Sequence, residues 1–273
     1  VCSSDLPDFE PMSPLLNYIH RRDGATEIYF VASRTNGPVS VDCRFRVTGK
    51  SPELWNAVTG DHRAAAYQQL PGQTQVTLDF EPYGSWFVVF RQPAEALISE
   101  KQNHRANLVT LAEITGAWTV RFDTNWAGPA EVQFDSLVSW PLRDEPGIKF
   151  FSGTAVYQKT FDLKDSAVGD RQSAILLDLG NVRELAEVKV NGKSCGITWT
   201  PPFRVDITSA VQPGVNQLEV EVVNFWPNRI IGDAALPKAQ RLTRTNIRKL
   251  TAETKLMESG LLGPVRVLRQ SGR

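Results

Sequence analysis

The sequence has no excess charge of either sign, few cysteines and no long apolar run. Its 273 residues carry 30 basic and 30 acidic side chains, so the formal net charge is zero. A net charge of zero argues against binding to nucleic acid or to an anionic membrane surface, and it favours a neutral ligand. No apolar stretch approaches the roughly 18 residues that a membrane-spanning helix needs. The composition therefore predicts a protein that binds neither nucleic acid nor membranes.

Cysteine and histidine are too scarce to suggest a metal centre. The chain has three of each, and none has the spacing of a metal site. Cys43 and Cys195 fall in different predicted domains among alternating apolar residues, which predicts two buried thiols rather than a disulfide. Among the histidines, His20 in Ile-His-Arg-Arg is interpreted as a structural residue.

Motifs for hydrolytic catalysis are also missing. There is no Gly-x-Ser-x-Gly motif, and strands do not alternate with helices of 10 to 15 residues as they would in a barrel. Carboxylates that stand near strands are interpreted as strand-surface or turn residues: Glu113, Asp123, Asp178 and Glu187. The sequence predicts no catalytic residue in this chain.

The first six residues, Val1 to Leu6, are set apart from the rest. A codon string that encodes them matches the end of a common sequencing adapter, and we interpret residues 1–6 as adapter-derived. The natural protein is then expected to continue upstream of Pro7. Residues 7 to about 16 contain three prolines and are typical of a connector.

What is present is a series of short alternating strands. Val39 to Val47 gives five matches to a period of two, and Thr74 to Phe80 alternates again. Turn signals such as Asn36-Gly37 recur at intervals of about 8–12 residues, which predicts a small antiparallel β-domain over residues 7–92. Residues 93–109 are polar and are predicted to be a linker, with a short helical turn as an alternative for 94–102.

The most informative stretch is residues 186–233, within a second predicted β-domain over residues 110–273. Val188 and Val190 alternate with polar residues, and Asn191-Gly192 predicts a tight hairpin turn. Cys195, Ile197 and Trp199 alternate on the returning strand. Further strands follow up to Trp226, and the polar run from Asp233 to Ser259 predicts a long surface loop before a last strand over 265–268.

This order of motifs resembles the galactose-binding-like jelly roll of family 2 glycoside hydrolases. The resemblance is carried by Val190-Asn191-Gly192, Pro202-Phe203, Pro213-Gly214 and Leu-Glu-Val-Glu-Val-Val-Asn. Trp226 to Asp233 and Ser259 to Val265 resemble the carboxy-terminal region of family 106 enzymes, the α-L-rhamnosidases. Four segments resemble the β-domain that follows the catalytic barrel in that family: IHRR, IYFVAS, PELWNAVTG and GSWFVVFR.

The resemblance implies an all-β chain, a small antiparallel β-domain followed by a galactose-binding-like β-sandwich. It implies a parent glycosidase that hydrolyses O-glycosyl bonds in oligo- or polysaccharides, in the periplasm or outside the cell. This fragment alone is expected to be inactive and to brace the catalytic barrel of the same parent chain. No cofactor is implied; jelly rolls of this kind can hold structural calcium, but no calcium-loop pattern is visible.

Six residues near predicted strand ends combine aromatic rings with groups that hydrogen-bond sugar hydroxyls. They are Trp199, Arg204, Trp226, Asn228, Arg229 and Asp233. They are predicted to bind carbohydrate or to face a neighbouring domain. The competing interpretation makes the tryptophans core residues and Arg229 with Asp233 a structural ion pair. Two further alternatives for the whole chain are a free-standing carbohydrate-binding module and a purely structural pair of domains.

Overall fold

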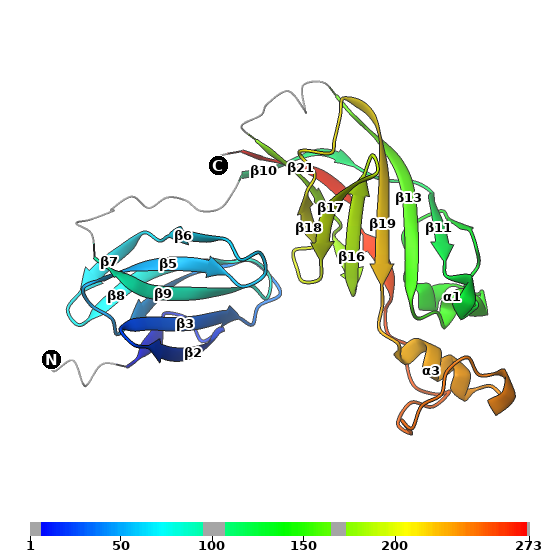
Figure 1. Cartoon of the computed structure of the whole chain (residues 1–273), viewed down its shortest axis with the longest axis horizontal. Coiled ribbons are helices and arrows are strands. Elements are labelled where there is room, and N and C mark those ends of the chain that lie inside the picture. Colours follow the sequence, from blue (N-terminus) through cyan, green and yellow to red (C-terminus); the bar gives the residue numbers. More distant parts are fainter. Residues whose placement is uncertain (1–6, 95–106, 165–172, 272–273) are drawn as a thin grey trace. The chain divides into compact units, whose positions relative to one another are not determined.

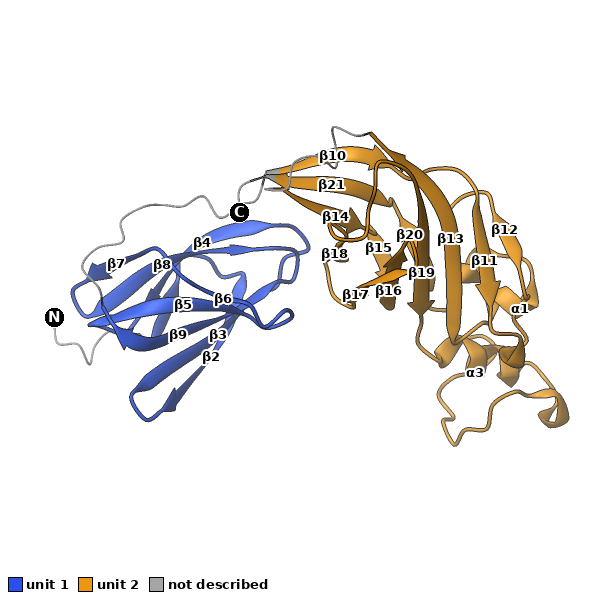
Figure 2. Cartoon of the chain, turned by 45° about the horizontal axis from the view of Figure 1, so that its top comes forward, with its two compact units in different colours: residues 1–105 blue, residues 106–273 orange. Residues whose placement is uncertain are grey.

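The chain folds into two compact units, residues 1–105 and 106–273 (Figure 2). The computed structural model describes residues 7–94, 107–164 and 173–271. The predicted adapter-derived segment and most of the predicted linker, with its alternative helical turn, lie outside these residues. Where the structure describes the chain, no helix is both long enough and apolar enough to cross a membrane.

Unit 1 consists of two antiparallel sheets that enclose one core. One sheet has the strand order β2-β3-β9-β5-β6 and the other β1-β4-β8-β7. The strands are β1 (Phe9–Pro11), β2 (Leu16–Asp23), β3 (Thr26–Ser33), β4 (Val39–Phe45), β5 (Lys50–Asn56), β6 (His62–Ala64), β7 (Tyr67–Leu70), β8 (Gln73–Phe80) and β9 (Ser85–Pro93).

The period-two pattern determines which face of each strand is buried in unit 1. Val41, Cys43 and Phe45 of β4 are buried, whereas Asp42 and Arg44 between them are half-buried. Each large apolar side chain so buried contributes roughly 1.5–3 kcal/mol. Burial also raises the pKa of the Cys43 thiol to about 12, which makes it an unreactive core residue.

Unit 2 is a larger β-sandwich. Its main sheet has the order β12-β11-β13-β19-β16-β17, a second sheet the order β10-β21-β14-β18, and β15 pairs with β20 (Figure 2). The strands are β10 (Asn107–Glu113), β11 (Trp118–Phe122), β12 (Val132–Phe134), β13 (Thr154–Leu163), β14 (Ala174–Asp178), β15 (Asn181–Arg183), β16 (Leu185–Val190), β17 (Lys193–Thr198), β18 (Arg204–Asp206), β19 (Gly214–Val223), β20 (Gly260–Gly263) and β21 (Arg266–Ser271). The predicted all-β fold class is confirmed.

The predicted hairpin at Asn191-Gly192 is present, with φ angles of 52° and 77°. The returning strand β17 is nevertheless an edge strand, because its neighbour within the described sheet is β16 alone. Ile197 and Trp199 are exposed, and Cys195 is half-buried rather than buried as the alternation predicted. A register shift between Val188 and Lys189 interrupts the alternation, so Ile197 pairs with Glu187 while Thr198 is the buried residue at that end of β17.

A short helix stands where the sequence predicted only a strand end and a loop. Helix α3 (Pro227–Ala234) begins four residues after β19 ends, and Figure 1 shows it leaving that end of the sheet. Six consecutive residues from Asn228 to Asp233 are buried. The chain then runs from Arg241 to Ser259 without a helix or strand, as the predicted long loop requires.

Candidate functional site

A cleft of about 550 Å³ opens beside α3 in unit 2. Four segments that are distant in sequence form it: the chain around Trp126, Ser152 with Gly153, the junction of β19 with α3, and the start of the long loop. Residues that give it chemical character are Trp126, Phe225, Trp226, Arg229, Thr243 and Arg244. We call this site the α3 cleft.

Three aromatic side chains make the walls of the α3 cleft apolar. Trp126, Phe225 and Trp226 are 42%, 53% and 52% exposed, although rings of this size usually pack inside a protein. Flat aromatic faces pack well against the C–H groups of sugar rings, while nearby polar groups satisfy the hydroxyls. The arrangement is therefore suited to a saccharide or to an apolar surface of another domain.

The start of α3 is fixed by proline and by a side chain from the other wall. Pro227 occupies the first turn, where its missing N–H costs nothing. The Arg229 backbone N–H donates to Ser152 Oγ at 3.1 Å, which ties α3 to the segment that precedes β13. These contacts set the position of Trp226, which stands at the N-cap.

Arg229 and Asp233 form a buried ion pair one helical turn apart. Arg229 Nη2 lies 2.9 Å from Asp233 Oδ1, and both side chains are more than nine-tenths buried. The two groups are not aligned for a hydrogen bond, so Arg229 Nε and Asp233 Oδ1 have no hydrogen-bond partner among the described residues. Asp233 Oδ2 accepts hydrogen bonds from the Thr243 N–H at 2.7 Å and from Thr243 Oγ1 at 2.6 Å. The pair thus anchors the long loop where that loop lines the cleft.

Two asparagines hold the far end of the long loop. Asn228 donates to the Met257 carbonyl at 2.7 Å and accepts from the Met257 N–H at 2.8 Å. Asn224 donates to the Phe151 carbonyl at 3.0 Å and to Ser259 Oγ at 2.9 Å. Both side chains are buried, and these hydrogen bonds are made to other groups of the protein. They shape the α3 cleft rather than face a ligand.

The six predicted site residues therefore separate into three groups. Trp226 and Arg229 line the α3 cleft, while Asn228 and Asp233 support it from the buried side of α3. Trp199 and Arg204 do not line it.

Trp199 is exposed just beyond the edge strand β17. Arg204 Nε donates to Asp178 Oδ2 at 2.7 Å, which joins neighbouring strands β18 and β14. These two residues belong to other surfaces of unit 2.

Sequence reasoning missed the residues that complete the cleft, above all Trp126, Phe225 and Arg244. Phe225 adjoins Trp226, and the pair of aromatic residues before a proline was a usable signal. Trp126 and Arg244 carry no such signal, because their sequence distance from Trp226 is 100 residues and 18 residues. Only the folded chain brings them together.

A second groove, of about 630 Å³, runs over the outer face of the main sheet. Its walls are polar, and its side chains bind one another: Gln158 donates to Glu219 at 3.0 Å, and Lys189 pairs with Glu219 at 3.5 Å. No aromatic residue lines it. We therefore regard the smaller α3 cleft as the better candidate for a saccharide.

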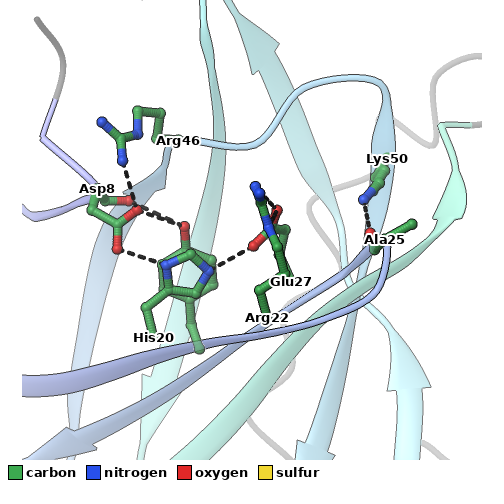
Figure 3. A network of polar contacts seen from close by, with 8 residues as sticks. Asp8, His20, Arg22, Ala25, Glu27, Arg46 and Lys50 are labelled. Atoms are coloured by element: carbon green, nitrogen blue, oxygen red, sulfur yellow. Dashed lines mark hydrogen bonds and ion pairs between the residues drawn. The ribbon is translucent and has the colours of Figure 1, made fainter. Parts of the chain in front are cut away.

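Unit 1 contains a charged cluster around His20 (Figure 3). His20 Nδ1 lies 2.8 Å from Asp8 Oδ2, its Nε2 lies 2.7 Å from Glu27 Oε2, and its ring stacks on Tyr29 at 4.0 Å. Arg22 also binds Glu27. Every polar atom of the imidazole is thus used within the fold, as the structural interpretation of His20 predicted.

Electrostatics in this cluster follow from burial and from the paired cations. Burial favours the neutral form of Glu27, but hydrogen bonds from Arg22 and His20 and their charges outweigh it, so the pKa of Glu27 lies below its ordinary value. Burial, with the nearby Asp8 carboxylate, raises the pKa of Tyr29 well above that of a free tyrosine. Both groups keep their ordinary charge states at neutral pH.

The described residues contain no cluster of three or more histidine, cysteine or acidic side chains able to hold a metal ion. Four carboxylates were interpreted from the sequence as strand-surface or turn residues, and each of them has a partner within the fold. Asp123 caps a short 3-10 turn through the Asn125 N–H, and Asp178 pairs with Arg204. Glu113 lies near Arg266, and Glu187 accepts from Ser194.

Two parts of the chain match models of known protein families. Residues 3–69 match the family model described as alpha-L-rhamnosidase, glycoside hydrolase family 106. Residues 145–254 match the model described as glycosyl hydrolase 2 galactose-binding domain-like. Both models describe glycoside hydrolases, and the second covers every lining residue of the α3 cleft except Trp126.

A rhamnosidase structure from Novosphingobium sp. PP1Y aligns with 98% of this chain at 36% identity and a TM-score of 0.83. A curated protein of Formosa agariphila, provisionally named a beta-glucuronidase, is 38% identical over 177 residues, 56% of this chain. The chain is related to the family 106 α-L-rhamnosidases and carries a galactose-binding-like domain of the family 2 type. It spans only 25% of the Novosphingobium chain and 15% of the Formosa protein.

Proposed function

We propose that this chain supplies the non-catalytic β-domains of a larger glycoside hydrolase. The parent enzyme would cleave terminal α-L-rhamnosides in oligo- or polysaccharides, in the periplasm or outside the cell. The observation that carries the proposal is the 36% identity to a rhamnosidase along 98% of this chain, which corresponds to one quarter of that enzyme. The described residues supply two β-units and no helix-surrounded barrel.

In this proposal the two units brace the catalytic barrel of the same parent chain, and the α3 cleft faces carbohydrate. The exposed rings of Trp126, Phe225 and Trp226 support a surface that is covered when the protein works, because exposed aromatic clusters usually mark binding or interaction sites. The buried hydrogen bonds of Asn228 and Asp233 support a cleft built to keep its shape.

Hydrolysis of p-nitrophenyl α-L-rhamnopyranoside tests the enzymatic part. We expect no activity from the present chain and activity from the full-length parent protein. A parent variant that stops before residue 107 should lose thermal stability together with activity. Hydrolysis by the present chain alone would contradict the proposal, since the catalytic groups would then lie within it.

A free-standing carbohydrate-binding module is the alternative that the aromatic cleft favours. Screening the chain on an array of plant and microbial glycans distinguishes the two. A parent reading frame without a catalytic barrel, combined with glycan binding, would make the module the better description. An intact fold that binds no glycan would leave only the structural role for the pair of domains.

A further inference from the structure

The α3 cleft continues into a neighbouring hollow of about 430 Å³, and the two share five lining residues on α3 and the long loop. Around the combined space the lining side chains include four cations and one carboxylate. The cations are Arg229, Lys238, Arg241 and Arg244, and the carboxylate is Asp233. The protein as a whole has no net charge, so this concentration of positive charge is local.

The carboxylate does not neutralise the rim of the cleft. Asp233 is buried, and its oxygens are engaged with Arg229 and Thr243. The charges of Arg229 and Asp233 thus offset each other, and the positive charge of the lining is carried by Lys238, Arg241 and Arg244. Arg244 is exposed, and the structure gives it no hydrogen bond or ion pair among the described residues.

Arg241 differs from Arg244 in being held by the backbone. It donates to the carbonyls of Leu236 and Ala234 at 2.9 and 3.4 Å, which fixes its charge beside α3. Guanidinium groups bind carboxylates through paired hydrogen bonds, and positive potential in a concave surface raises the local concentration of anions. Aromatic walls and a basic rim together match a sugar ring that carries a negative charge.

We propose that the α3 cleft binds an acidic saccharide, a sugar whose carboxylate lies beside Arg244 while its ring packs on Trp226. The proposal rests on the proposed carbohydrate role of this cleft and names the class of sugar. It replaces the neutral ligand that the net charge favoured, because the charges that matter are those lining the cleft.

Titration calorimetry of the full chain with tetragalacturonate and with its fully methyl-esterified form tests this directly. The ester keeps the ring faces and removes the charge. We expect the acid to bind about fivefold more tightly at low salt, and the difference to shrink as salt is added. Arg244→Gln should abolish the difference. Arg248→Gln is the matched control, because Arg248 lies in the same loop but lines neither hollow.

The outcomes separate the two proposals. Equal binding of acid and ester overturns the acidic-saccharide proposal and leaves a carbohydrate cleft standing. A preference for the acid that survives Arg244→Gln places the recognition elsewhere and also overturns it. Binding of neither ligand, with the fold intact by circular dichroism, overturns the acidic-saccharide proposal, and the carbohydrate role of the cleft is contradicted as well when no glycan on the array binds.

Discussion

Asn228 and Met257 exchange two hydrogen bonds across 29 residues of chain, the side-chain amide of one pairing with the backbone N–H and C=O of the other. The same amide donates to Ser259 Oγ at 3.1 Å. A single buried side chain thus replaces the backbone pairing that the long loop lacks. Hydrogen bonds from α3 therefore hold the loop in place, and the loop in turn forms one wall of the α3 cleft.

Replacing Asn228 with alanine should therefore loosen the loop. The backbone groups of Met257 would lose their partners inside the protein, at a cost of about 2 kcal/mol in the free energy of unfolding. Urea unfolding of the full chain measures this cost, and hydrogen exchange should accelerate at the Met257 amide. Asn246→Ala, an exposed change in the same loop, is the control and should leave both measurements unchanged.

Trp226→Ala should weaken binding to any glycan that the chain recognises by up to about tenfold, because an exposed aromatic contact contributes at most about 1.4 kcal/mol. Stability should change little, since the ring is half exposed. The measurement is the dissociation constant of the natural chain and of Trp226→Ala for the glycan that the array identifies. Trp199→Ala is the matched control, as Trp199 is equally exposed but lies outside the cleft. A larger effect from Trp199 would move the binding site to the edge of the main sheet.

Gly260→Ala should destabilise unit 2 strongly. Gly260 has a φ angle of 102°, and an added Cβ would lie 2.4 Å from Trp140 Nε1 and 2.7 Å from the Tyr157 hydroxyl. Those two groups bind each other at 2.6 Å in the core and have no room to move. We expect a loss of about 3 kcal/mol, measured by thermal or urea unfolding.

Gly192→Ala separates backbone strain from the clash at Gly260. Gly192 also has a positive φ, but an added Cβ there would meet nothing within 4 Å. Its cost should be only about 1 kcal/mol, the strain of the left-handed conformation. Equal losses from the two variants would show that the contacts with Trp140 and Tyr157 are unimportant.

Acid should destabilise unit 1 through Glu27. The pKa of this carboxyl is lower in the folded protein than in the unfolded chain, so its contribution is fully present above the unfolded value and is lost as the pH falls through the folded value. Urea midpoints measured from neutral pH down to acid should fall less steeply for Glu27→Gln than for the natural chain. Arg22→Gln, which removes one of the partners of Glu27, should move the loss to higher pH. An unchanged pH profile in Glu27→Gln would contradict this account.

Much of the fold follows from local pattern. The alternation over Val39 to Val47 predicted β4, and Asn191-Gly192 predicted the hairpin between β16 and β17. These features depend on neighbours in the sequence, namely the period of two in a strand and the positive φ angles of a tight turn. The family resemblance rested on the same turns and strands, and the comparisons bear it out.

Helix α3 was beyond such reasoning. Its eight residues contain Pro227, Asn228, Gly232 and Asp233, which favour turns when considered alone. The helix is held by tertiary contacts, with Ser152 at its start and Met257 and Thr243 along its buried side.

The sequence alone determined the strands, their turns and the class of fold, because each depends on residues a few positions apart. The tertiary structure decided which alternating residues are covered, leaving Ile197 of β17 and Trp199 just beyond that strand exposed. It also decided that Trp126, Trp226 and Arg244 meet in one cleft. Burial and charge clustering depend on which distant segments pack together, and no local pattern of residues contains that information.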